Sequence, residues 1–152
     1  MENSNASSFS KRAVQTTYLL LRLVSGFLLM QAGGLILFGW YGGMPDGQTV
    51  SLLSQTGVGG ILEFFGGILI MLGLATRPVA FILSGMLAVA YWQFHAPLGR
   101  WPIQNNGMPA VLLCFIFLNI AARGAGQWSL DALIRRKVQR AAMKERTSPR
   151  AL

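Results

Sequence analysis

Cysteine and histidine are almost absent from this sequence, which has one of each, Cys114 and His95. A single cysteine cannot form an internal disulfide or supply the paired thiols of a membrane disulfide oxidoreductase. A single histidine cannot supply a pair of axial haem ligands. Clustered metal ligands, a glycine-rich nucleotide loop and a Ser-His-Asp arrangement are missing too. We therefore expect no metal site and no intrinsic cofactor.

Charged side chains are also scarce. They make up 12% of the 152 residues, whereas hydrophobic residues make up 53%, and the mean hydropathy is +0.47. Soluble proteins carry about 25% charged residues. This composition predicts a membrane protein with one domain, because four spans of about 20 residues would use just over half of the chain. No length remains for a second, catalytic domain.

Most of the charges are basic, with 13 Lys and Arg against five acids. Seven basic residues fall within the last 18 positions, after the final apolar run: Arg135, Arg136, Lys137, Arg140, Lys144, Arg146 and Arg150. This position is typical of the cytoplasmic flank of a membrane span, not of a nucleic-acid site. We therefore expect the lipid bilayer, and no nucleic acid, as a partner.

Four apolar segments predict an all-α protein, a four-helix transmembrane bundle. We expect a flexible cytoplasmic tail over residues 1–13 and a transmembrane domain over residues 14–124, with spans at about 14–38, 58–76, 78–95 and 107–123. The first is too long for a signal peptide and should remain as an anchor. Pro78 favours the first turn of a helix and cannot extend the preceding one, so the second and third spans should form an antiparallel hairpin.

The basic residues also predict the orientation. With both termini inside, the basic residues next to the spans and in the C-terminal cluster face the cytoplasm, and only Arg100 lies in an outer loop. The topology is therefore N-in and C-in, in a bacterial-type inner membrane. An outer aromatic belt would contain Trp40, Tyr41, Trp92 and Trp101.

The residues after the fourth span predict one more helix. Ser129 is placed to cap a helix that begins at Leu130, with Asp131 in its first turn. Apolar residues recur on one face and basic residues occupy the rest, which indicates a basic amphipathic helix over residues 128–146 on the cytoplasmic surface. A solvated basic tail is the alternative. Residues 147–152 should form a tail.

Two charged residues, Arg22 and Glu63, fall inside the apolar segments. A charge at the centre of a bilayer costs at least ~2.5 to 3.5 kcal/mol, so neither should face lipid. Each shares a helical face with glycines, which allow close approach of membrane helices. We therefore expect both side chains to point into the bundle, where each needs a partner or a function.

Depth separates these two charges. Helical rise places Glu63 roughly 21 Å above Arg77, whereas Arg22 lies only about 12 Å above Val14. We therefore expect two polar clusters, listed here by their members: an outer one of Glu63, Trp92 and His95, and an inner one of Arg22, Asn119 and Asp131. Arg22 could simply fix the bundle. Glu63 is the best candidate for a catalytic, proton-carrying or head-group-binding residue, with a structural role as the alternative.

Several segments resemble the DoxX family. Residues 63–77, Glu-Phe-Phe-Gly-Gly-Ile-Leu-Ile-Met-Leu-Gly-Leu-Ala-Thr-Arg, are similar to its second-helix signature. The spacing from Arg22 to Gly26, the segment from Asn105 to Ala110 and the closing segment from Gly124 to Asp131 are similar too. The resemblance implies a small four-helix integral membrane protein, related to a membrane subunit associated with thiosulfate:quinone oxidoreduction.

The chain also departs from the family pattern. Many members carry a Glu just before the fourth span, where this chain has Met108-Pro109. A second carboxylate is therefore missing, which weakens the transfer of any two-acid or proton-relay mechanism. Family membership implies the architecture better than the activity.

Three functions remain open at this point. The first is a redox-associated membrane subunit that contacts quinone or a soluble oxidoreductase partner, or assembles with another membrane subunit, and is not a complete enzyme alone. The second is a small proton-coupled carrier that uses the Glu63 carboxylate. The third is a non-catalytic membrane scaffold. A homo-oligomer is also open, because GxxxG-like spacing in the second span serves helix pairing between or within chains.

Overall fold

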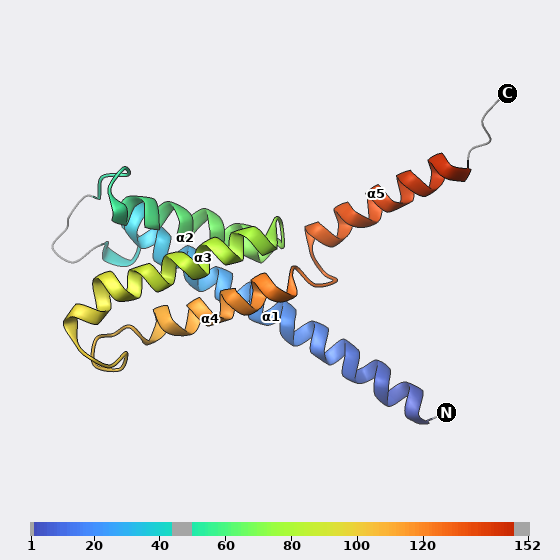
Figure 1. Cartoon of the computed structure of the whole chain (residues 1–152), viewed down its shortest axis with the longest axis horizontal. Helices are drawn as coiled ribbons and strands as arrows, with labels where there is room; N and C mark the ends of the chain where they lie inside the picture. Colours follow the sequence, from blue (N-terminus) through green and yellow to red (C-terminus); the bar gives the residue numbers. More distant parts are fainter. Residues whose placement is uncertain (1, 44–49, 148–152) are drawn as a thin grey trace.

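The computed structural model confirms the all-α class (Figure 1). It describes residues 2–43 and 50–147, and the side chains of residues 10–43 and 50–144, so the predicted tail lies outside the described residues from residue 148 on. The five α-helices are α1 (Glu2–Phe38), α2 (Gln55–Leu72), α3 (Thr76–Ala90), α4 (Met108–Arg123) and α5 (Leu130–Thr147). The described residues also contain a π-helical turn, η3 (Tyr91–His95), and two 3-10 turns, η1 (Trp40–Gly42) and η4 (Ala96–Leu98). They contain no strand.

Three helical segments are long and apolar enough to cross a membrane: Ser10–Phe38, Gln55–Leu72 and Thr76–Leu98. The fourth apolar helix, α4, has 16 residues. A helix of that length spans about 24 Å, somewhat less than the ~30 Å of a hydrocarbon core. Length and composition therefore support three spans directly, and α4 is a shorter apolar helix.

The first helix begins earlier than the apolar pattern. Residues 2–13, for which we expected a flexible tail, are helical in the structure. No glycine or proline interrupts the chain before Gly26, and the hydroxyl groups of Thr16 and Thr17 donate to the carbonyls of Arg12 and Ala13 at 3.0 Å. Apolar periodicity indicates which residues are buried, and a helix can extend beyond them.

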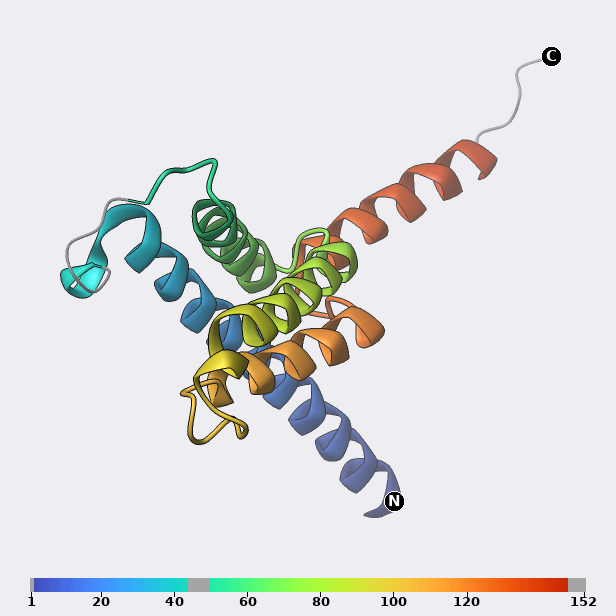
Figure 2. The same ribbon diagram turned by 60° about the vertical axis from the view of Figure 1, so that its left-hand side comes forward.

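The helices pack mainly as two pairs, α1 with α2 and α3 with α4, and α2 also contacts α3 (Figure 2). Glycines bring α1 and α2 together. A Cβ atom on Gly67 would lie 2.5 Å from the carbonyl oxygen of Gly26, and one on Gly33 would lie 2.6 Å from that of Gly60. Only glycine permits this distance between helix backbones.

The second and third helices run antiparallel and side by side, joined by the turn of residues 73–75 (Figures 1 and 2). Gly73 ends α2 in the left-handed conformation, with φ of 68°. Ala75 is also left-handed, with φ of 47°, and precedes α3 without a side-chain cap of its own. The turn is therefore tight and leaves backbone N–H groups at the start of α3 to be satisfied from elsewhere.

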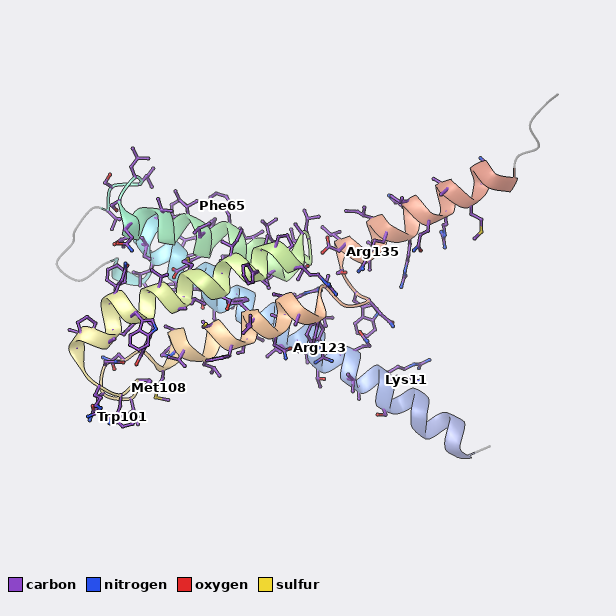
Figure 3. The ribbon with its side chains drawn as sticks, viewed as in Figure 1. Lys11, Phe65, Trp101, Met108, Arg123 and Arg135 are labelled. Atoms are coloured by element: carbon purple, nitrogen blue, oxygen red, sulfur yellow. The ribbon has the colours of Figure 1, made fainter. Side chains whose placement is uncertain are left out.

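The core is small and apolar. Its fully buried members include Leu29, Ile70, Leu83, Phe117 and Ile120, which come from α1, α2, α3 and α4. Many large apolar side chains lie outside this core and are exposed, such as Phe65 on the outer side of α2 (Figure 3). An apolar exterior of this extent is unusual in soluble monomers and fits a lipid-facing surface.

Candidate functional site

Glu63 lies in the middle of α2 and lines a pocket of about 500 Å³ between α1, α2, α3 and η3. The apolar part of the pocket wall includes Ile36, Met86, Val89, Ala90 and Phe94. Its polar part consists of Gln55, Thr56, Glu63 and His95. A mostly apolar pocket with a few converging polar groups is the usual form of a small-molecule site. We name it the Glu63 pocket.

The carboxyl group of Glu63 is the exceptional group in this pocket. Its Oε2 atom is buried and has no hydrogen-bond partner among the described residues. Burying a polar atom without a partner costs free energy, and most buried polar atoms in proteins are paired. The Oε2 atom of Glu63 therefore lacks, among the described residues, the partner that most buried polar atoms have.

Polar contacts at one end of the pocket hold η3 in place. Gln55 at the start of α2 donates from Nε2 to Oε1 of Gln93. His95 Nδ1 lies 3.0 Å from the carbonyl oxygen of Asn105, and its ring stacks on Tyr91 with 6.3 Å between centroids. Because a carbonyl only accepts, Nδ1 carries the proton and Nε2 is the acceptor of the neutral ring. Single π-turns occur frequently at functional sites.

The structure brings together two of the three residues of the predicted outer cluster. Glu63 and His95 both line the pocket. Trp92 is 71% exposed and is not part of the pocket wall. Sequence reasoning missed Thr56 and Gln55, which lie seven and eight residues before Glu63 and so share its side of the helix. Extending that face by two turns would have found both.

In the inner cluster, Arg22 contacts backbone instead of side chains. It is 2% exposed, and its Nη1 donates to the carbonyl of Ala125. Its Nη2 donates to the carbonyl of Trp128 at 2.8 Å. Asn119 is exposed on α4, and no hydrogen bond joins it to Arg22 in the described part of the chain. Arg22 therefore ties α1 to the connection between α4 and α5.

Asp131, the third residue of that cluster, caps a helix other than its own. Its carboxylate accepts from the backbone N–H groups of Ala75 at 2.9 Å and Thr76 at 3.0 Å, where α3 begins. Its own N–H donates to the carbonyl of Gly73 at 2.9 Å. Burial alone would raise the pKa of Asp131, but the N–H groups of Thr76 and Ala75 stabilise the carboxylate and lower this pKa below its ordinary value.

The predicted cap of the last helix is confirmed. Ser129 Oγ accepts from the N–H of Ala132 at 3.1 Å. Arg22, Ser129 and Asp131 thus join α1, the α2–α3 turn and the start of α5 through backbone groups. These contacts join the elements at this end of the helices and engage polar groups of all three side chains with backbone.

The described residues contain no group of three or more His, Cys, Asp or Glu side chains that could hold a metal ion. Cys114 is a free, half-buried thiol on α4. The hydroxyl group of Ser84 on α3 donates to the carbonyl of Cys114 at 2.9 Å, so this pair joins α3 to α4. The chemistry of the described residues is therefore concentrated on the Glu63 carboxyl and its neighbours.

Comparison with known proteins identifies relatives of this chain. The DoxX family model matches residues 17–96, from α1 to η4, and so includes Arg22, Glu63, Arg77 and His95. An uncharacterized protein of Haemophilus influenzae is 46% identical over 77 residues, which are 49% of this chain and 58% of that protein. The inner membrane protein YqjF of Escherichia coli is 30% identical over 77 residues, 51% of this chain and 59% of that protein.

The chain spans less than two thirds of the length of either relative. No solved structure matches it. The family match covers more than half of the chain, and the apolar helices agree with the inner-membrane relative. The protein is an integral membrane protein that crosses the inner membrane several times, and it belongs to the DoxX family.

Proposed function

We propose that the four apolar helices form a transmembrane bundle with both termini in the cytoplasm. Basic side chains support this orientation, because Lys11, Arg123 and Arg135 lie at the opposite end of the molecule from Trp101 and Met108 (Figure 3). Cytoplasmic flanks are rich in Lys and Arg, whereas Trp favours the interface. In this orientation the Glu63 pocket lies in the outer part of the bundle, because its wall includes Gln55 at the start of α2 and His95 at the end of η3.

We further propose that the protein is a redox-associated membrane subunit that binds a quinone head group in the Glu63 pocket. The observations that carry this proposal are that Glu63 lines a pocket of about 500 Å³ and that its buried Oε2 has no partner among the described residues. Pockets for small molecules range from about 300 to 1,000 Å³. The apolar wall suits a quinone ring and the start of its tail, and the polar groups suit its oxygens.

The electrons must come from a partner. Reduction of a quinone takes two electrons and two protons and yields a quinol, and a soluble oxidoreductase would supply the electrons. The protonated carboxyl group of Glu63 can donate a hydrogen bond to a quinone carbonyl, and the ionised form can accept one from a quinol hydroxyl. Glu63 would therefore orient the head group in both redox states and hold a proton next to it.

The test measures quinone bound to the full chain, purified in native lipid particles and after titration with a short-chain ubiquinone. We expect wild-type protein to retain quinone. Glu63→Gln should bind ubiquinone severalfold more weakly, because the neutral hydrogen bond from the protonated carboxyl group contributes about 0.5 to 1.5 kcal/mol and the amide replaces only part of it. The control is Trp92→Ala, since Trp92 lies on the same π-turn but outside the pocket wall. Equal binding by wild type and Glu63→Gln, or none by wild type, would refute the proposal.

A second candidate function rests on the same carboxyl. A buried carboxyl group that accepts nothing from the described residues can also exchange a proton, as membrane carboxylates do in transporters. A proton-coupled carrier predicts substrate-dependent proton flux in liposomes that stops in Glu63→Gln. Unchanged flux in that variant would exclude Glu63 from transport.

The third candidate is a scaffold, and it rests on α5. This helix extends away from the other helices and is largely exposed (Figures 1 and 2). Truncation after Ala132 would remove most of α5 while keeping Ser129 and Asp131. Loss of partner capture in the truncated protein, with capture unchanged in Glu63→Gln, would favour the scaffold over the other two functions.

A further inference from the structure

A second pocket, of about 430 Å³, lies where the α2–α3 turn meets the connection between α4 and α5. Three arginines from three different helices line it: Arg77 from α3, Arg123 from α4 and Arg135 from α5. Figure 3 shows Arg123 and Arg135 on either side of the α4–α5 connection. This arginine pocket shares no residue with the Glu63 pocket.

Neutral groups hold two of the three arginines in place. The Arg77 side chain lies against Gly124, because a Cβ atom on Gly124 would lie 2.9 Å from Nε of Arg77. The guanidinium group of Arg123 lies 4.7 Å from the ring centroid of Tyr18, whose hydroxyl donates to the carbonyl of Gly124 at 2.6 Å. These contacts orient the guanidinium groups without neutralising their charge.

Arg135 and Asp131, the remaining charged residues of the pocket wall, also make hydrogen bonds to backbone groups. Arg135 donates from Nε to the backbone carbonyl of Asp131 at 3.2 Å. Asp131 is the one acidic side chain of the pocket wall, and its two oxygens accept from the N–H groups of Ala75 and Thr76. Over the part of the chain that the structure describes, no ion pair joins these arginines to a carboxylate. The pocket wall therefore carries three arginines and one carboxylate, whose oxygens already accept from backbone N–H groups and whose pKa the charge of Arg135 also lowers.

We propose that the arginine pocket binds a phosphate group. A guanidinium group presents parallel N–H donors that match phosphate oxygens, and arginine is the side chain most often used for this recognition. The pocket lies at the end of the helices where the basic residues gather, and basic pockets at that level bind the head groups of anionic lipids. A soluble phosphate ester offers the same chemistry, so the lipid phosphate and the soluble phosphate must be separated by experiment.

The experiment uses the full chain in particles of zwitterionic phosphatidylcholine. In one arm, phosphatidylglycerol or cardiolipin is titrated into the particles, and in the other, inorganic phosphate or pyrophosphate is added to the buffer. Binding is measured by native mass spectrometry and by the rise in melting temperature. The variants are Arg77→Gln and Arg135→Gln, and the control is Arg140→Gln, which removes the same charge from an equally exposed position on α5 outside the pocket.

We expect each pocket variant to bind about tenfold more weakly, because it loses a charge-assisted hydrogen bond, and Arg140→Gln to bind like wild type. This pattern with anionic lipid alone assigns a lipid head group, and the pattern with phosphate or pyrophosphate assigns a soluble ligand. Equal losses in all three variants would mean diffuse charge attraction and would overturn the proposal, as would no binding in either arm. Melting temperatures without ligand show whether each variant is folded.

Discussion

Asp131 allows a direct test of how the helices are joined near the start of α5. Its carboxylate accepts from the backbone N–H of Thr76, 55 residues earlier in the sequence, and so caps α3. Asp131→Ala would leave the N–H groups of Ala75 and Thr76 without their acceptor. Each hydrogen bond to a charged group contributes about 1.5 to 3 kcal/mol in buried sites. Asp131 is only half-buried, so water would replace part of that, and we expect a total loss of about 2 kcal/mol.

The pH dependence of this contribution follows from the lowered pKa of Asp131. A carboxyl group whose pKa is lower in the folded state favours folding when it is ionised. Its contribution is complete above the unfolded pKa of about 3.9 and is lost as the pH falls through the folded value. Asp131→Asn keeps one acceptor oxygen and should lose about half as much stability as Asp131→Ala. Because an amide does not ionise, the stability of Asp131→Asn should not show the loss at low pH that comes from protonation of Asp131.

The assay is thermal unfolding of the full chain in an uncharged detergent at several pH values. A loss of about 2 kcal/mol should lower the melting temperature by roughly 4 to 8 °C in a chain of this size. Ser129→Ala is the matched comparison, because it removes the cap of α5 together with the hydroxyl's hydrogen bond to the carbonyl of Gly126, and it should cost about 1 kcal/mol. Asp131→Ala melting like wild type, or no worse than Ser129→Ala, would refute the cross-helix cap.

Four further substitutions test the packing of the helices by the same melting assay. Gly67→Ala should destabilise by about 1 to 3 kcal/mol, because its Cβ would lie 2.5 Å from the carbonyl oxygen of Gly26. In the control Gly85→Ala, the added Cβ atom would meet nothing within 4 Å, so this variant should be as stable as wild type or more stable by up to about 1 kcal/mol. Equal melting temperatures of Gly67→Ala and Gly85→Ala would contradict the close approach of α1 and α2. Arg22→Met should cost about 3 kcal/mol or more, because two backbone carbonyls lose a charged donor, and a small effect would mean that water replaces it. Tyr18→Phe removes one hydrogen bond and should cost about 1 kcal/mol; a loss as large as that of Arg22→Met would point to repacking.

The helices and the meeting of Glu63 with His95 could be predicted from the sequence. Apolar runs indicate helices, and a fixed rise per residue gives the depth of each side chain. Depth does not give rotation about the helix axis. A π-turn contains an extra residue, which turns the following side chains by roughly 100° relative to a regular helix. Trp92 and His95 lie at similar depth in this turn, but only His95 lines the pocket.

The inner cluster shows a second limit of the sequence. The sequence predicts that Arg22 and Asp131 lie in one cluster of polar side chains, because side chains of opposite charge often pair. Both instead bind backbone groups, Arg22 the carbonyls of Ala125 and Trp128 and Asp131 the N–H groups at the start of α3. Every residue carries these groups, so no sequence pattern marks the partners. These partners become visible only in the structure, where the α2–α3 turn lies beside the start of α5.

The charged groups at the two ends of the molecule are satisfied to different degrees. At the end where α5 begins, Asp131 uses both carboxylate oxygens and Arg22 uses both terminal nitrogens in hydrogen bonds to backbone, although the buried Nε of Arg22 has no partner in the described residues. In the Glu63 pocket, a buried carboxylate oxygen has no partner in the described residues. A buried polar group without a partner lowers stability, so its presence is best explained where a ligand or a function requires it. Glu63→Gln should therefore change binding while leaving the melting temperature of the ligand-free protein unchanged or higher, whereas Arg22→Met should lower that temperature. If Glu63→Gln lowered the melting temperature as much as Arg22→Met does, Glu63 would be a packing residue. The Glu63 pocket would then no longer be supported as a functional site.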